Sequence, residues 1–185
     1  MKKVKRLLKL SILAVFMVSV GMMVFTSCEE DDPKVDAMVG NYAFTSAVLA
    51  SDLMNADTVF MPSGTNVTLI VGGGMFGSTP CDNVLNAAVE LRKSNEIYFV
   101  CCGETNELKA GIWSIDDERT TLTLTLSPPA VPQALALEVT ELVEGATTFT
   151  GKITNLPVSS EIFQLPPGGV LLLTINITFT KLPVC

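Results

Sequence analysis

The chain has 185 residues, of which 48% are apolar and 17% are charged, and its formal net charge is −7. This length and composition predict one folded domain and argue against a disordered chain. The sequence has no histidine, which excludes serine–histidine and cysteine–histidine hydrolases and zinc sites built from imidazoles. We therefore predict a protein that is not an enzyme and that uses no metal or cofactor.

The first 27 residues differ from the rest of the chain in charge. They hold five basic residues and no acid, whereas the remainder holds 7 basic and 19 acidic residues, a net charge of −12. An apolar run over residues 10–25 follows the bases, and it is shorter than the about 20 residues of a membrane span. This order predicts a secretory signal peptide over residues 1–27. An uncleaved membrane helix is the alternative.

Cys28 follows the apolar run. Residues 24–28 resemble a bacterial lipobox, with Phe25 where leucine is usual. The resemblance implies that Cys28 carries diacylglycerol and begins the mature protein. Because each buried methylene contributes about 0.8 kcal/mol, two or three acyl chains make the lipid bilayer a permanent partner. The alternative is an ordinary core thiol, but the acidic residues beside Cys28 leave no core for it.

Four acidic residues come directly after the cysteine. Glu29, Glu30, Asp31 and Asp32 resemble the export signal of Bacteroidota lipoproteins, which implies the outer membrane and exposure at the cell surface. The alternative is a solvated spacer on a lipoprotein that faces the periplasm. Both interpretations predict a linker over residues 28–37 and a domain over residues 38–185.

From Val39 onward, apolar and polar residues alternate. Leu122, Leu124 and Leu126 share one face while threonines occupy the other, as a half-buried strand requires. No helical period is found after the signal, and residues 72–77 are predicted to form a flexible glycine-rich turn. Nine strands are predicted, over residues 42–49, 67–71, 84–91, 97–102, 109–115, 120–126, 135–140, 147–154 and 173–180.

These strands predict an all-β antiparallel meander that closes on itself or folds over, because open sheet edges invite association. Gly40-Asn41-Tyr42 resembles the Gly-x-Trp opening of lipocalins, with Tyr42 in place of tryptophan. Trp113, within residues 111–115 and before an acidic turn, resembles the same position in lipocalin-like domains of Bacteroidota lipoproteins. The resemblance covers most of residues 38–182 and implies a lipocalin-like barrel. It departs from lipocalins in having no arginine near the last strand. A β-sandwich is the alternative.

Four cysteines remain beyond the predicted lipid site: Cys81, Cys101, Cys102 and Cys185. An even number in an exported chain predicts disulfides. Backbone strain disfavours a bond between the two neighbours, so Cys81 pairs with one of them and Cys185 with the other. Neighbouring strand residues face opposite ways, so one bridge is expected inside and one outside. Four zinc-bound thiolates are the competing interpretation, but no Cys-x-x-Cys spacing supports it.

Two functions remain for such a chain. The first is a non-catalytic barrel that binds a small, apolar ligand, with any cavity walled near Tyr42, Phe44, Phe99 and Trp113. The second is a cell-surface interaction or structural protein, such as an adhesin or an accessory of a glycan-uptake complex. A nucleic-acid partner is not expected, because phosphates repel a domain charged at −12.

Overall fold

The computed structural model describes residues 35–55, 58–163, 168–183 and 185. The predicted signal peptide, Cys28 and the acidic residues Glu29 to Asp32 lie outside this part of the chain. The described barrel belongs to a compact unit, Asp36–Cys185. Within the described residues, helices that are long and apolar enough to cross a membrane are not found.

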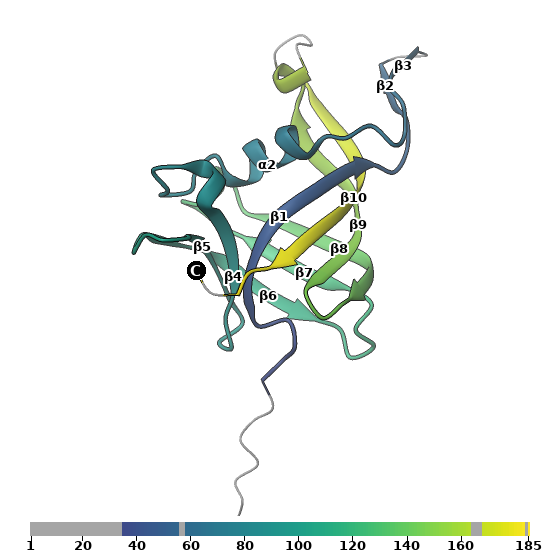
Figure 1. The fold of residues 1–185 in the computed structure, drawn as a ribbon. Coiled ribbons are helices and arrows are strands. Elements are labelled where there is room, and N and C mark those ends of the chain that lie inside the picture. Colours follow the sequence, from purple (N-terminus) through teal and green to yellow (C-terminus); the bar gives the residue numbers. More distant parts are fainter. Residues whose placement is uncertain (1–34, 56–57, 164–167, 184) are drawn as a thin grey trace, which may run out of the picture. The chain divides into compact units, whose positions relative to one another are not determined.

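Eight antiparallel strands form a closed barrel in the order β1-β10-β9-β8-β7-β6-β5-β4 (Figure 1). Each strand pairs with its neighbour along the chain, and the first and last strands pair to close the sheet. The barrel strands are β1 (Gly40–Leu49), β4 (Ala87–Leu91), β5 (Glu96–Cys101), β6 (Glu107–Ile115), β7 (Leu122–Leu126), β8 (Leu135–Glu144), β9 (Thr148–Ser159) and β10 (Val170–Lys181).

The other elements lie in the connections. Strands β2 (Leu53–Asn55) and β3 (Thr58–Met61) form a separate two-stranded hairpin. Helix α2 (Thr68–Phe76) and the short 3-10 helix η1 (Val84–Asn86) lie between this hairpin and β4, and a second 3-10 helix, η2 (Ser160–Phe163), follows β9.

The structure confirms the all-β antiparallel meander and its closure into a barrel, so the sandwich alternative is wrong. The alternating pattern identified all eight barrel strands, because one face of each is buried against the core. In β7, for example, Leu122, Leu124 and Leu126 are buried and the threonines between them are partly exposed. The hairpin of β2 and β3 was not predicted.

Two predictions are wrong in the connection before β4. Residues 67–71 were predicted as a strand and residues 72–77 as a turn, but Thr68–Phe76 is helix α2. The helix is stabilised by tertiary contacts, since Val71 and Phe76 are buried, and such contacts override weak local propensity. The predicted strand at 84–91 starts later, at Ala87, because Val84–Asn86 forms η1.

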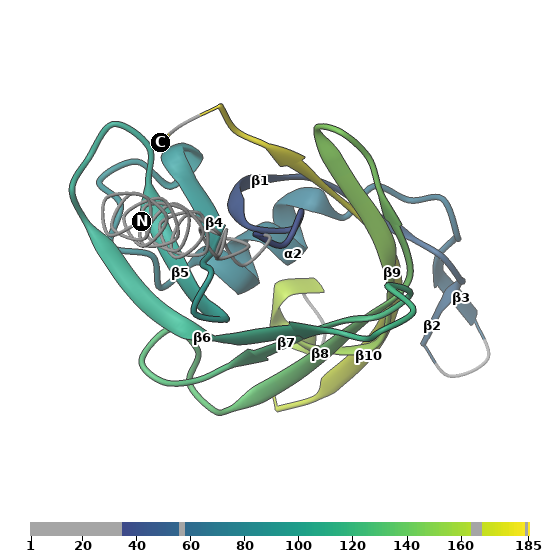
Figure 2. The same cartoon turned by 90° about the horizontal axis from the view of Figure 1, so that it is seen from below.

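The barrel has two different ends. At the closed end the chain enters at Asp36, and short turns join β4 to β5, β6 to β7 and β8 to β9. At the mouth, longer connections carry α2, η1, η2 and the β2–β3 hairpin. Figure 2 looks into the barrel from the closed end, with α2 lying across the lumen beyond it.

Candidate functional site

Aromatic side chains fill the closed end of the barrel. The ring centroids of Phe149 and Phe179 are stacked 4.8 Å apart, and the Tyr42 ring meets Phe149 edge-on at 5.0 Å. The void between these three rings, Val89, Leu91 and Leu124 measures about 10 Å³, which is at or below what one water molecule needs. This part of the barrel is therefore a packed core and not a ligand cavity.

Ion pairs tie the entering chain to the closed end. Arg119 Nη1 lies 2.8 Å from Asp36 Oδ2, and its Nη2 lies 2.7 Å from Glu144 Oε2. Hydrogen bonds from Arg119 hold the pKa of Asp36 below its usual value, although partial burial opposes this effect. Lys181 Nζ donates to the Ala37 carbonyl at 3.2 Å. Asp36 and Ala37, which the sequence pattern assigned to the linker, thus contact the barrel.

The four residues expected to wall a cavity divide between the two ends. Tyr42 and Trp113 are buried, and Trp113 Nε1 donates to the Arg92 carbonyl at 3.1 Å. Phe44 and Phe99 lie nearer the mouth, where both contact Phe76 of α2, at 5.9 and 5.4 Å between ring centroids. Among the cleft-lining residues that the structure describes, only Phe44 of these four lines a mouth opening.

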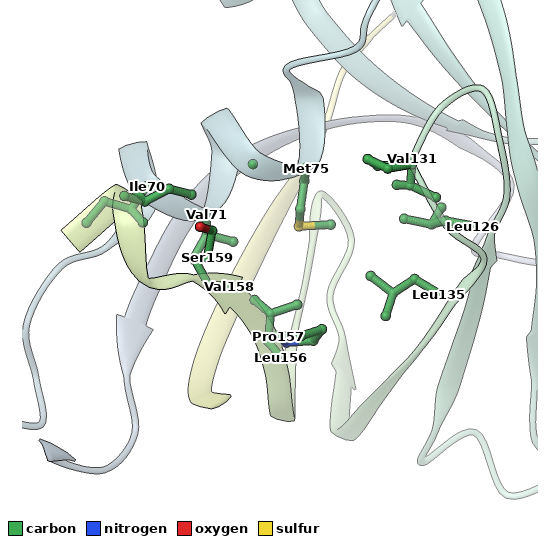
Figure 3. A pocket seen from close by; sticks show the side chains of 13 residues that line it. Ile70, Val71, Met75, Leu126, Val131, Leu135, Leu156, Pro157, Val158 and Ser159 are labelled. Atoms are coloured by element: carbon green, nitrogen blue, oxygen red, sulfur yellow. The ribbon is translucent and has the colours of Figure 1, made fainter. Parts of the chain in front are cut away.

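An apolar cleft of about 300 Å³ lies at the mouth, between α2, the β7–β8 connection and the end of β9. We call it the mouth cleft. In Figure 3, Met75 extends from α2 into its middle, with Val131, Leu126 and Leu135 on one side and Pro157 and Val158 on the other. Its lining residues are Ile70, Val71, Gly74, Met75, Leu126, Val131, Pro132, Leu135, Leu156, Pro157, Val158, Ser159 and Ile162.

Helix α2 is held at the start by β1. The Val67 amide donates to the Ala47 carbonyl at 2.9 Å, and the Ala47 amide donates to Thr68 Oγ1 at 2.9 Å. Asn66 Oδ1 accepts the Thr68 amide at 2.9 Å, which supplies a polar partner just where the helix begins. These hydrogen bonds hold α2, which forms one side of the mouth cleft, against the barrel wall.

The end of α2 is followed by a disulfide. Cys81, five residues after Phe76, is bonded to Cys101 at the end of β5. The second disulfide joins Cys102 to Cys185. The predicted disulfide bonding is confirmed, and the structure selects one of the two pairings left open. Cys101 is buried with Ile97 and Phe99, while Cys102 is partly exposed, as the alternation along β5 indicated.

A second cleft, of about 260 Å³, lies on the other side of α2. Its lining includes Phe44, Gly73 and Phe76, together with two strongly exposed leucines. Leu69 is 88% exposed and Leu85 is 85% exposed. Large exposed apolar side chains that border a groove are typical of contact surfaces.

On the outer wall, Arg92 is the centre of a cluster of charged and aromatic side chains. Arg92 Nη2 lies 2.6 Å from Glu90 Oε2 and 2.5 Å from Glu107 Oε2, and its guanidinium lies 3.6 Å above the Tyr98 ring. In the part of the chain that the structure describes, no group of three histidine, cysteine, aspartate or glutamate residues is arranged to hold a metal.

The residues of the mouth cleft were missed by the sequence pattern. Gly74 and Met75 fell in the predicted turn, and Ser159 and Ile162 fell between predicted strands. One signal was available: Asn66 precedes an apolar run. Asparagine is favoured where helices begin, because its side-chain oxygen can accept a backbone amide there.

The chain matches no protein-family model, and neither a curated protein nor a solved structure is significantly similar to it. Its candidate site is therefore defined by geometry and chemistry alone.

Proposed function

We propose that this protein is a lipocalin-like lipoprotein, anchored through Cys28 in the bacterial outer membrane and exposed at the cell surface, that binds a small apolar molecule without catalysing a reaction. The mouth cleft carries the proposal. Its volume, about 300 Å³, is at the lower end of the range for ligand sites, about 300–1,000 Å³. Twelve of its thirteen lining residues are apolar or glycine, so an apolar guest gains free energy by leaving water.

The anchor is supported by the signal sequence and by the place where the chain joins the barrel. Asp36 lies eight residues after Cys28 and at the closed end. The mouth is the end of the barrel opposite Asp36 (Figure 1).

Ligand binding is tested by extracting the protein from its own membranes and identifying co-purified small molecules by mass spectrometry. Ile162, at the rim of the mouth cleft, is 45% exposed, and Ile112, on the outer wall in β6, is 55% exposed. We expect Ile162→Trp to lose the bound molecule and Ile112→Trp to retain it. Equal recovery from both variants, or no molecule from the native chain, contradicts the proposal.

The anchor is tested separately. We expect the N-terminal peptide to begin at Cys28 and to carry diacylglycerol, and Cys28→Ser to release the protein from the membrane fraction. Protease treatment of intact cells should remove the domain. A domain that survives until the envelope is broken faces the periplasm instead.

A surface interaction protein is the second candidate, and the exposed leucines beside the second cleft favour it. Leu69→Ser together with Leu85→Ser should then abolish reproducible protein partners after crosslinking on intact cells. Partners that persist in this variant contradict the second candidate.

A further inference from the structure

Three consecutive glycines, Gly72, Gly73 and Gly74, lie in the interior of α2. Interior glycines destabilise helices, because they lose the most backbone freedom on folding. Neither Gly73 nor Gly74 is required by crowding, since a Cβ built on either residue meets no atom within 4 Å. The space left by their missing side chains opens into the two clefts: Gly74 lines the mouth cleft and Gly73 the second cleft.

The mouth cleft has almost no polar chemistry. Among the described residues that line it, Ser159 alone has a polar side chain. Ser159 is solvent-exposed at the edge of the cleft, and its Oγ accepts the Glu161 amide at 3.3 Å, so the hydroxyl can still donate its own proton. One neutral hydrogen bond is therefore the polar recognition that the lining offers a guest.

Charge around the mouth cleft disfavours anions. The described basic residues are Arg92, Lys93, Lys109, Arg119, Lys152 and Lys181, and none of them lines the cleft. The charged residue nearest in sequence to the lining is an acid, Glu161, between Ser159 and Ile162. A carboxylate placed among the apolar lining side chains would lose its hydration and gain no cation.

We propose that the mouth cleft selects uncharged apolar molecules with one hydrogen-bonding oxygen, seated against the bare backbone of α2 at Gly74. The inference rests on the proposed function, and it names the ligand class and the point of contact. An alcohol, ketone or ester on an aliphatic or cyclic body fits this lining, because its single oxygen can accept the Ser159 proton. A free fatty acid does not fit, since its carboxylate has no partner there.

Three photoreactive probes that share one alkyl chain and one diazirine test the selection. They end in a hydroxyl, a methyl ester or a carboxylate, and they are presented to the full-length lipoprotein in lipid nanodiscs at a pH where the carboxylate is ionised. Peptide mapping then measures labelling of residues 68–76, 126–135 and 156–162. We expect the two neutral probes to label these segments at least about tenfold more than the carboxylate.

A matched pair of variants locates the guest. Gly74→Leu fills the mouth cleft and Gly73→Leu fills the second cleft, and both substitutions improve helix propensity equally. We expect Gly74→Leu to abolish the labelling and Gly73→Leu to preserve it. Ser159→Ala should reduce labelling about two- to tenfold, as the loss of one hydrogen bond predicts.

The outcomes distinguish an error in the ligand class or the contact point from an error in the proposed function. Equal labelling by the carboxylate overturns the selection for uncharged molecules and leaves ligand binding standing. Labelling that Gly73→Leu abolishes and Gly74→Leu preserves overturns the contact at Gly74. No labelling of these segments by any probe overturns the proposed function itself.

Discussion

The closed end and the mouth are formed by the same strands, but the closed end is packed with side chains and the mouth carries a cleft. At the closed end, stacked rings leave a void of about 10 Å³, and Arg119 pairs with Asp36 and Glu144 over the entering chain. At the mouth, a glycine-rich helix borders an uncharged cleft of about 300 Å³. The difference shows that closing a small barrel does not decide whether open space remains at its ends. The side chains at each end fill that space or leave it open.

The largest effect is expected at the closed end. Phe179 is 2% exposed and lies against Phe149 and Phe44. We expect Phe179→Ala to lower the free energy of unfolding by about 3–5 kcal/mol, because it leaves a cavity that the packed rings cannot fill. Urea denaturation measures the loss. At the mouth, exposed Leu69→Ala should change the same quantity by less than about 0.5 kcal/mol. Similar losses would remove the contrast between the two ends.

Removing the disulfide next to α2 should cause the second largest loss in the free energy of unfolding. It closes a loop with a sequence separation of 20, so Cys81→Ser with Cys101→Ser should cost about 3 kcal/mol. Hydrogen exchange of residues 68–76 should accelerate beyond the change in overall stability, since the end of α2 is no longer held. Cys102→Ser with Cys185→Ser is the control, and it should leave exchange in α2 tied to overall unfolding. Equal local effects would show that the first bridge does not position the helix.

Tyr42 should make the closed end sensitive to alkali. Burial, together with the nearby carboxylates of Glu144 and Asp36, raises its pKa from 10.0 to about 12. Because the folded state holds the proton more tightly, stability is fully present below pH 10 and falls as the pH rises from 10 to 12. The full loss amounts to about 2–3 kcal/mol.

The variant that tests this prediction is Tyr42→Phe. Thermal unfolding measured across the same pH range should show a shallower decline for Tyr42→Phe than for the native chain. An identical decline in both proteins would assign the effect to other groups.

The smallest expected effect is a gain in stability from a substitution in α2, at the mouth. A Cβ on Gly73 meets open space, so Gly73→Ala should stabilise the domain by up to about 1 kcal/mol through better helix propensity. Gly77→Ala is the control, since its Cβ would lie 2.6 Å from the Gly73 carbonyl oxygen, and no gain is expected. Calorimetry distinguishes the two. No gain from Gly73→Ala would mean that α2 contributes little to cooperative unfolding.

The barrel could be predicted from the sequence because each of its strands has one wet face and one dry face. For this reason Leu124 and Leu126 alternate with threonines. The same alternation explains why Cys101 is buried while its neighbour Cys102 is partly exposed. Local alternation therefore predicted the strands and the two faces of β5. Closure was expected for a different reason, because open sheet edges invite association, and that reason left a sandwich as the alternative.

The mouth cleft could not be predicted in this way. Helix α2 is apolar on all sides and interrupted by glycines, so it has no amphipathic period. Its position depends on contacts distant in sequence, such as the Val67 amide on Ala47 and the ring of Phe76 on Phe99. Ser159 and Ile162 reach the cleft only because β9 and η2 bring them beside α2.

The pairing of β1 with β10 also constrains how the protein is made. Tyr42 opposes Lys181 in the ladder, so the seam joins segments that leave a ribosome or a translocation channel far apart in time. Until β10 is available, β1 lacks one of its two neighbouring strands and the barrel stays open. Closure of the barrel is therefore postponed until nearly the whole domain has been synthesised, because the pairing that closes the sheet is the most distant in sequence.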